Sequence, residues 1–221
     1  MKLTVFNGSP RGQKSNTKIL LEHFLQGFQE TPGNSHEIYY LNRIREATAF
    51  QQAFGQAEVA LLAFPLYTDA MPGLVKAFIE TLGIYCTREN NPAMGFIVQS
   101  GFMEATHSRH VEKYLEKLSA RLGSRYLGTV IKGGVEGIQV QPPGMTHKLF
   151  ERFSLLGRVF GQTGRFDEAI LGELAQPERL TKPMIVLLTL MGMTGLTSFY
   201  WDSQLKANNA FEERFARPYT E

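Results

Sequence analysis

The residues best suited to chemistry lie at positions 8–17, where a short apolar segment ends, the chain turns through glycines and a helical pattern begins. Backbone N–H groups in the first turn of a helix lack intrahelical acceptors and carry partial positive charge, so they attract anions. Hydroxyl and amide side chains stand close by, and a guanidinium can add a fork of charged donors. The candidate ligands are Ser9, Arg11, Ser15, Asn16 and Thr17. This segment predicts a phosphate-binding loop.

The spacing of the glycines excludes two common phosphate loops. A Walker A loop has four residues between its first glycine and an adjacent Gly-Lys pair, whereas three residues separate Gly8 from Gly12 and Gln13 precedes Lys14. The dinucleotide motif G-x-G-x-x-G fails because Pro10 stands where its second glycine is required. Neither an ATPase nor a dinucleotide-binding Rossmann domain is therefore predicted.

The run GSPR at residues 8–11, followed by SNT at residues 15–17, resembles the FMN-phosphate loop of NADPH-dependent FMN reductases and flavodoxin-like quinone reductases. Residues 64–78, with the pattern P-x-Y and then P-G-x-x-K, resemble the loop that lines the flavin ring in that family. Residues 99–104 correspond to the loop around the pyrimidine edge of the ring. The resemblance implies ring contacts from a second set of residues: Pro65, Leu66, Tyr67, Thr68, Ser100, Gly101 and Phe102.

This resemblance implies non-covalently bound FMN, with NADH or NADPH as the co-substrate. Reduction places negative charge near N1 and the C2 carbonyl of the ring, and backbone N–H groups of residues 100–103 can stabilise that charge. No catalytic side chain is expected, because the flavin itself carries the chemistry. Two interpretations remain open for His107 and Arg109. They contact the nicotinamide phosphate, the flavin edge or the substrate, or they belong only to the start of a helix.

The elements that would position these loops follow from the hydrophobic pattern. Short apolar runs at residues 3–6, 37–41, 59–64, 95–100 and 126–131 predict five buried strands, and helical spacing occupies residues 16–28, 71–85 and 108–123. Alternation of this kind predicts an α/β protein with a flavodoxin-like, doubly wound, five-stranded parallel sheet. All three loops then leave strand C-termini, where open α/β sheets bind ligands.

The pattern changes to helices alone from about residue 142, at residues 147–161, 167–175 and 183–201. We expect a flavodoxin-like FMN-binding domain at residues 1–140 and a helical C-terminal extension at residues 141–221 that packs on the same domain. The apolar run 183–201 nearly reaches the length of a membrane span, but its glycines and threonines, with Lys182 and Asp202 nearby, favour a buried helix. Its methionines and aromatic residues are expected in the core or at a homodimer interface.

The composition indicates which classes of partner and which cellular compartment to expect. A net charge of +2 over 221 residues offers no strong field for nucleic acid or an anionic membrane surface. The single cysteine, Cys86, excludes an intramolecular disulfide and a cluster of thiolate ligands, so no metal is expected. The first residues lack the apolar stretch of a signal peptide, and a cytoplasmic protein is expected.

These observations together predict an FMN-dependent NAD(P)H oxidoreductase that passes hydride to a quinone, free flavin, azo or nitro compound. The alternative is a flavodoxin-type electron carrier that serves a protein partner. Small flavodoxins are typically acidic, so the slightly basic balance and the extra helices of this chain favour the reductase. A flavin-binding regulatory or trafficking protein with little turnover also remains open.

Overall fold

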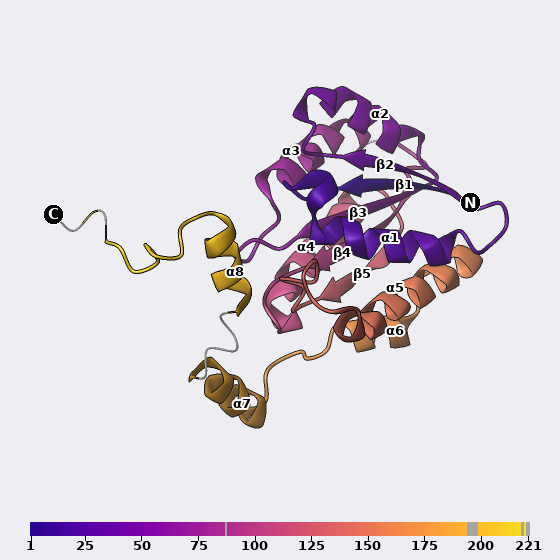
Figure 1. Ribbon diagram of the computed structural model, residues 1–221. Helices are drawn as coiled ribbons and strands as arrows, with labels where there is room; N and C mark the ends of the chain where they lie inside the picture. Colours follow the sequence, from indigo (N-terminus) through magenta and orange to yellow (C-terminus); the bar gives the residue numbers. More distant parts are fainter. Residues whose placement is uncertain (87, 194–198, 218, 220–221) are drawn as a thin grey trace. The chain divides into compact units, whose positions relative to one another are not determined.

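The computed structural model describes residues 1–221 except for 87, 194–198, 218, 220 and 221 (Figure 1). Five parallel strands form one sheet in the order β2-β1-β3-β4-β5. Their bounds are β1 (Lys2–Asn7), β2 (Ser35–Tyr40), β3 (Val59–Pro65), β4 (Ala93–Gln99) and β5 (Tyr126–Lys132). The predicted doubly wound sheet is confirmed, and this strand order is that of flavodoxin-like folds.

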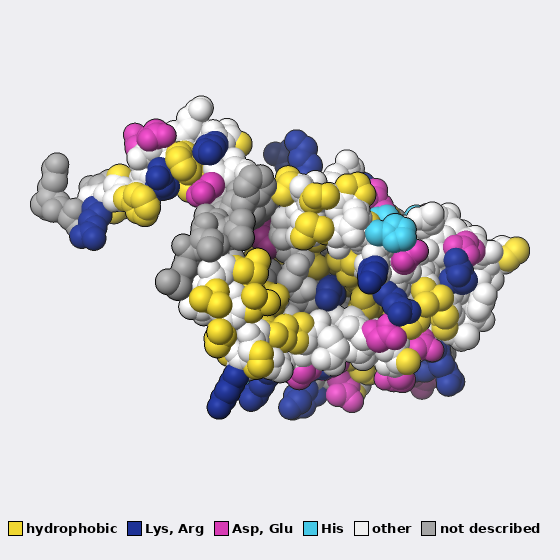
Figure 2. All heavy atoms as spheres, turned by 60° about the horizontal axis from the view of Figure 1, so that its bottom comes forward, with side chains coloured by type: hydrophobic (Ala, Val, Ile, Leu, Met, Phe, Trp, Pro, Cys, Tyr) yellow, Lys and Arg dark blue, Asp and Glu magenta, His cyan; other side chains and the backbone are white. Residues whose placement is uncertain are grey.

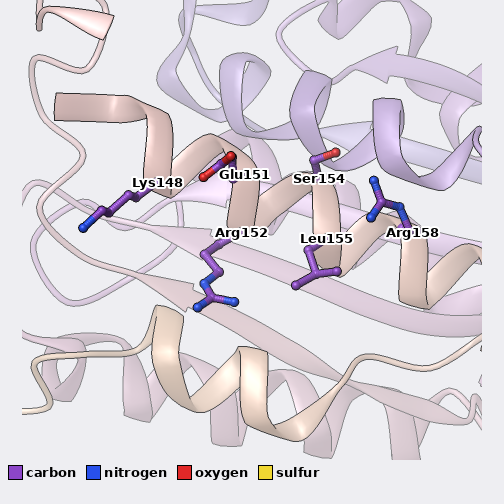
Figure 3. Close-up of a pocket in the computed structure, with 6 residues that line it drawn as sticks. All are labelled: Lys148, Glu151, Arg152, Ser154, Leu155 and Arg158. Carbon is purple, nitrogen blue, oxygen red and sulfur yellow. The ribbon is translucent and has the colours of Figure 1, made fainter. Parts of the chain in front are cut away.

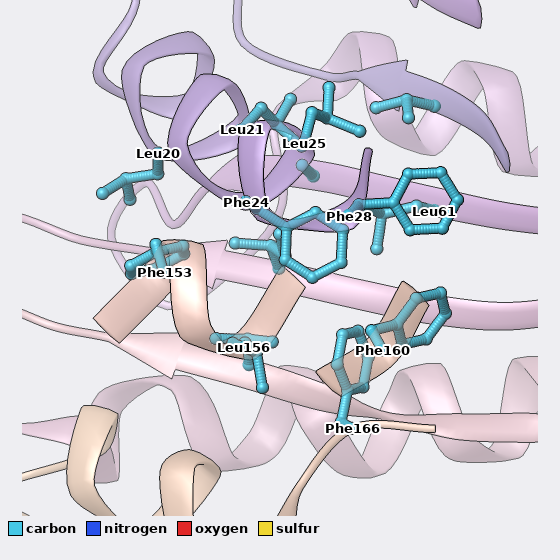
Figure 4. Packing of buried hydrophobic residues seen from close by; sticks show 14 of the residues in the cluster. Leu20, Leu21, Phe24, Leu25, Phe28, Leu61, Phe153, Leu156, Phe160 and Phe166 are labelled. Atoms are coloured by element: carbon cyan, nitrogen blue, oxygen red, sulfur yellow. The ribbon is translucent and has the colours of Figure 1, made fainter. Parts of the chain in front are cut away.

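Side chains that alternate along the strands fill two separate cores. Val5, Leu61 and Ile97 point to the face covered by α1 (Asn16–Phe28), α5 (Pro143–Thr163) and α6 (Glu168–Leu174), as Figure 4 shows for part of this cluster. Leu62 and Phe96 point to the opposite face, covered by α2 (Ala47–Gln56), α3 (Gly73–Thr81) and α4 (Arg109–Arg121). Strands buried on both faces read as apolar throughout, which explains why the sequence pattern identified them.

Helix α2 is absent from the sequence-based prediction. It buries only Phe50 and Phe54, and the rest of its sequence is alanine, glutamine, threonine and glycine, so its apolar face is too narrow for a clear helical period. It lies between β2 and β3 and covers the edge of the sheet together with α3 (Figure 1).

Glycines allow α1 and α5 to approach each other closely. A Cβ atom added to Gly157 of α5 would lie 1.8 Å from the carbonyl oxygen of Phe24 in α1. The contact is reciprocal, because a Cβ at Gly27 of α1 would lie 1.8 Å from the carbonyl oxygen of Ser154. The pair is further joined by Arg158, whose Nε donates to Glu30 at 2.5 Å. Helix α5 is thus a tightly fitted part of the layer that holds α1 against the sheet.

The chain divides into two compact units, Met1–Arg179 and Leu180–Glu221. The second unit contains α7 (Lys182–Met193) and α8 (Phe199–Ala207). The domain boundary expected near residue 140, and the packing of the last residues on the sheet, stay predictions. No helix in the described ranges is both long and apolar enough to cross a membrane.

The burial expected for the apolar run 183–201 stays a prediction, because its first half forms α7 in the second compact unit. Ile185, Val186, Leu187 and Leu190 of α7 are 49% to 59% exposed. The remainder of the run includes residues 194–198, which lie outside the described residues. A helix that is apolar on all sides is typical of a buried position, either inside a fold or at an interface.

On the face of the molecule shown in Figure 2, Lys and Arg side chains are interspersed with Asp and Glu. This mixture agrees with the small net charge of +2. A surface of mixed sign produces little long-range attraction for a polyanion.

His23 makes the stability of the α1–α5 pair dependent on pH. Its ring stacks on Phe150 with centroids 4.0 Å apart, and burial lowers its pKa in the folded protein. The unfolded chain, with a histidine pKa near 6.5, binds the proton more readily, so stability is present above about pH 6.5 and falls as the pH drops. His36, whose pKa burial also lowers, acts in the same direction.

We therefore expect the free energy of unfolding, measured with urea, to decrease between about pH 7.5 and pH 5.5. His23→Gln should make this decrease smaller. His110→Gln, which removes an exposed imidazole from α4, is the control and should leave the slope unchanged. An equal slope for wild type and His23→Gln would contradict the assignment.

Candidate functional site

The three predicted loops leave neighbouring strands at one edge of the sheet. The strand register places Asn7 of β1 beside Ala63 of β3, and Pro65 of β3 beside Gln99 of β4. The chain runs outward in both directions from the β1–β3 pair, so the loops surround the point where the strand order reverses. Ligands of open parallel sheets bind in the crevice at such a point.

Internal hydrogen bonds hold the first loop in shape. The Ser9 amide donates to Oδ1 of Asn7 at 2.9 Å, and the Gly12 amide donates to the Ser9 carbonyl at 2.9 Å. Ser15 caps α1, because its Oγ accepts from the Lys18 amide at 3.1 Å and donates to the Gly12 carbonyl at 2.6 Å. Helix geometry leaves the next two amides, of residues 16 and 17, without intrahelical acceptors.

Two buried polar groups behind the loop point to an anionic ligand. The fully buried Thr17 accepts at its Oγ1 a hydrogen bond from Nε2 of Gln99 at 3.3 Å, which leaves its hydroxyl proton to donate. The Nδ2 atom of Asn7 is buried and has no hydrogen-bond partner among the described residues. Unpaired buried donors are costly, and a phosphate oxygen is an acceptor suited to this position. These residues fit the phosphate group of FMN.

Predicted ligands of the first loop differ in exposure. Ser9 and Ser15 are buried, and Arg11 is exposed at the rim. The side chain of Asn16 already has protein partners, since its Nδ2 donates to the Val135 carbonyl at 2.8 Å and its Oδ1 accepts from Gln139 at 2.9 Å. Asn16 is therefore suited to bind a phosphate through its backbone amide and not through its side chain.

The loop after β5 was not predicted as part of the site. Nε2 of Gln139 also donates to the Lys14 carbonyl at 3.1 Å, so residues 135–139 hold the phosphate loop from the side. Position 133 requires glycine, because a Cβ at Gly133 would lie 2.4 Å from the Phe102 carbonyl oxygen of the third loop. The β5–α5 connection thus contacts both the phosphate loop and the ring loop.

The second loop is a tight turn. Tyr67 and Ala70 exchange backbone hydrogen bonds of 2.9 and 3.2 Å, and Thr68 between them has a positive φ of 56°. The Tyr67 ring is 48% exposed, whereas Leu66 is buried in the core cluster that contains α3. Pro65 ends β3 beside Gln99. An exposed aromatic ring on a braced turn is suited to flank a flat ligand.

Backbone bonds to the end of β5 shape the third loop. The Ser100 amide donates to the Lys132 carbonyl at 3.0 Å, so this amide extends the sheet and does not face a ligand. The Phe102 carbonyl accepts from the Gly134 amide at 2.8 Å and from the Ser100 hydroxyl at 3.1 Å. The amides of Gly101 and Phe102 are therefore the candidate hydrogen-bond donors from this loop to a ligand.

His107 lies between the second and third loops, and Arg109 belongs to a separate ion-pair network. The His107 ring stacks on Phe102 at 4.5 Å, with its Nδ1 3.9 Å from Asp69 and its Nε2 3.4 Å from Glu104. Arg109 donates to both oxygens of Glu178 and to Glu112 at 2.8 Å. These hydrogen bonds lower the pKa of the Glu178 carboxyl. Arg109 therefore joins α4 to the segment after α6. These ion pairs explain the position of its side chain without a ligand.

A hollow of about 620 Å³ forms a groove along α5 (Figure 3). Its lining residues come from this one helix and include none of the predicted cofactor ligands: Lys148, Glu151, Arg152, Ser154, Leu155 and Arg158. A groove formed along one helix offers few converging groups, so size alone does not identify the functional site.

The sheet order and the loops around its reversal point define a doubly wound α/β protein with an anion-binding loop at the start of α1. The chain belongs to the family described as having a flavodoxin-like fold, whose model matches residues 1–149. The resemblance inferred from the three loops is confirmed at this level.

Solved structures with the same fold include flavin-dependent reductases. An FMN-dependent NADH-azoreductase from Bacillus anthracis, in complex with FMN, is 16% identical over 73% of this chain and 100% of its own, with a TM-score of 0.56. An NAD(P)H:quinone oxidoreductase from Methanothermobacter marburgensis is 17% identical over 75% of this chain and 99% of its own, with a TM-score of 0.58. A Trp repressor binding protein from Bacillus subtilis is 21% identical over 69% and 95%, with a TM-score of 0.51. No curated protein matches the sequence.

Proposed function

We propose that this protein is an FMN-dependent NAD(P)H oxidoreductase that passes hydride from a nicotinamide nucleotide to a small acceptor. The observation that carries the proposal is the gathering of three loops, after β1, β3 and β4, at the reversal point of the sheet. Reductases with FMN or quinone chemistry in their names share this fold, which supports the reaction class. The acceptor is a quinone, a free flavin, an azo or a nitro compound.

The first loop is proposed to bind the FMN phosphate. The amides at the start of α1 and the Thr17 hydroxyl donate from below, and Arg11 adds a charged donor from the rim. Ser9 and Ser15 contribute through the shape they give the loop, since both take part in its internal hydrogen bonds. Binding at a preformed helix start requires little rearrangement of the chain.

The second and third loops are proposed to orient the flavin ring. Bound FMN supplies the hydride chemistry. The amides of Gly101 and Phe102 would donate hydrogen bonds to the ring of bound FMN, so no titrating side chain is required there. The exposed rings of Tyr67 and Phe102 would flank the ring of bound FMN and exclude water from it, with space left for a flat acceptor.

His107 is proposed as a positioning residue in this arrangement. Its ring stacks on Phe102, its Nδ1 faces Asp69 of the second loop, and its Nε2 faces Glu104, the residue before η4 (Ala105–Ser108). We further propose a cytoplasmic homodimer, as the composition and the apolar C-terminal residues suggest.

Anaerobic titration of the purified protein tests the proposal. The protein should purify yellow with about one FMN per chain, and either NADH or NADPH should bleach the flavin absorbance within seconds of mixing. Photoreduction is the control that establishes that the flavin can be reduced at all. Flavin that photoreduction bleaches but neither nucleotide does would identify an electron carrier, and a colourless protein that takes up no FMN would refute the cofactor.

A further inference from the structure

A second cationic hollow lies where the end of β5 meets α5 and α6. It has a volume of about 250 Å³ and is lined by Lys132, Lys148, Leu149, Arg152, Glu173 and Leu174. None of these residues belongs to the three flavin loops. Its charged lining consists of three cations and one carboxylate, an excess of positive charge that the proposed reaction does not use.

The single carboxylate of this hollow is already paired. Oε2 of Glu173 lies 3.0 Å from Nε of Arg152, and Figure 3 shows Arg152 directed from α5 towards α6. Within the described part of the chain, no carboxylate lies at salt-bridge distance from the ammonium groups of Lys132 or Lys148. Among the described residues, the Lys132 ammonium donates one hydrogen bond, a long one from its Nζ to the Gln176 carbonyl at 3.5 Å.

Lys132 is the unusual member of the group. It ends β5, an edge strand of the sheet, and its side chain is half-buried, which lowers its pKa through loss of hydration. A half-buried ammonium without an opposite charge is unfavourable, and a bound anion would relieve that cost. A phosphate near neutral pH carries a charge of about −1.5 to −2, opposite in sign to the two ammonium groups that have no carboxylate partner.

We propose that this hollow is a phosphate-binding site, with Lys132 as its central ligand and Lys148 and Arg152 beside it. The phosphate is either inorganic or the 2′-phosphate of an NADP-type nucleotide. The site is separate from the proposed flavin chemistry, but it is connected to the third loop. The Lys132 carbonyl accepts a hydrogen bond from the Ser100 amide at the base of that loop. Occupancy would therefore stiffen that loop.

Calorimetric titration of inorganic phosphate into FMN-saturated protein tests the site, with the flavin keeping the phosphate loop filled. Lys132→Met retains the length and apolar stem of the side chain and should weaken phosphate binding at least about tenfold. Lys117→Met, which removes an exposed lysine from α4, is the matched control for net charge and should bind as wild type does. Lys132→Gln is a second variant if the methionine variant fails to fold.

Equal affinity of wild type and Lys132→Met would overturn the proposal, as would an equal loss in Lys117→Met. Arg11→Ala separates the two anion sites: it should leave this phosphate affinity unchanged, and loss of binding in Arg11→Ala alone would move the phosphate to the flavin loop. Such a result would leave the proposed oxidoreductase intact, so the two failures are distinguishable.

Titration with NAD⁺ and NADP⁺ then distinguishes the two sources of phosphate. A preference for NADP⁺ that Lys132→Met abolishes supports the site and identifies the nucleotide phosphate. Inorganic phosphate binding that depends on Lys132, with equal affinity for both nucleotides, supports the site and identifies free phosphate.

Discussion

Replacing both Arg11 and Thr17 by alanine is expected to weaken FMN binding by about a hundredfold or more. Each side chain is proposed to give a phosphate oxygen a charge-assisted hydrogen bond, worth about 1.5–3 kcal/mol when one partner is ionised. Thr17 is fully buried and its hydroxyl bonds to Gln99, so the loss at this position also removes a preformed donor. Fluorescence quenching of FMN by the apoprotein measures the dissociation constant.

Conservative variants provide the control for that experiment. Arg11→Lys with Thr17→Ser keeps the charge and the hydroxyl, and should recover most of the affinity. The alanine variant must still unfold in one cooperative transition, with a loss of Tm no larger than removal of the buried Thr17 hydroxyl explains, since Arg11 is exposed and contributes little to the core. Full FMN affinity in a folded alanine variant would show that the phosphate is bound elsewhere.

The largest effect on stability is expected from Gly157→Ala. A Cβ at this position would lie 1.8 Å from the Phe24 carbonyl oxygen, and both atoms belong to helix backbones that cannot turn aside as a side chain can. The helices must separate and leave part of the Phe24–Phe160 cluster loosely packed. We expect a loss of about 3 kcal/mol or more, which lowers Tm by roughly 6–12 °C in a chain of this size.

Gly144→Ala provides a control within the same helix. Nothing lies within 4 Å of a Cβ added at Gly144, in the first turn of α5, so the substitution should leave Tm unchanged or raise it slightly. Thermal melts of the two variants followed by circular dichroism give the comparison. If the two alanine variants melt together, the close approach of α1 and α5 is not what stabilises this layer.

The sequence alone predicts those parts of the structure that depend on residues close together in the chain. The central strands β1, β3 and β4 carry nearly continuous apolar runs because both of their faces are buried. The phosphate loop is one short segment whose glycines, hydroxyls and helix start are adjacent. The turn at Tyr67 and the loop at Ser100 follow from the resemblance and from their places after strands. Their positions required no knowledge of distant contacts.

The features that sequence reasoning missed depend on distant residues. Val135 and Gln139, which are 119 and 123 residues away along the chain, form hydrogen bonds with the Asn16 side chain. Nothing in the sequence of either segment predicts this pairing. The same applies to Arg109, whose partner Glu178 is 69 residues away. In α7 the apolar composition predicts burial, but composition does not identify the surface that covers the helix.

The close contact of α1 with α5 also sets an order of events during synthesis. Gly27 leaves the ribosome long before Gly157 does, so α1, and with it the start of the phosphate loop, must wait for most of the chain before its final neighbour exists. Until then the apolar face of α1 has only the strands to cover it. The nascent protein should therefore acquire its ability to bind FMN late, in a single step, once α5 has emerged and closed on α1.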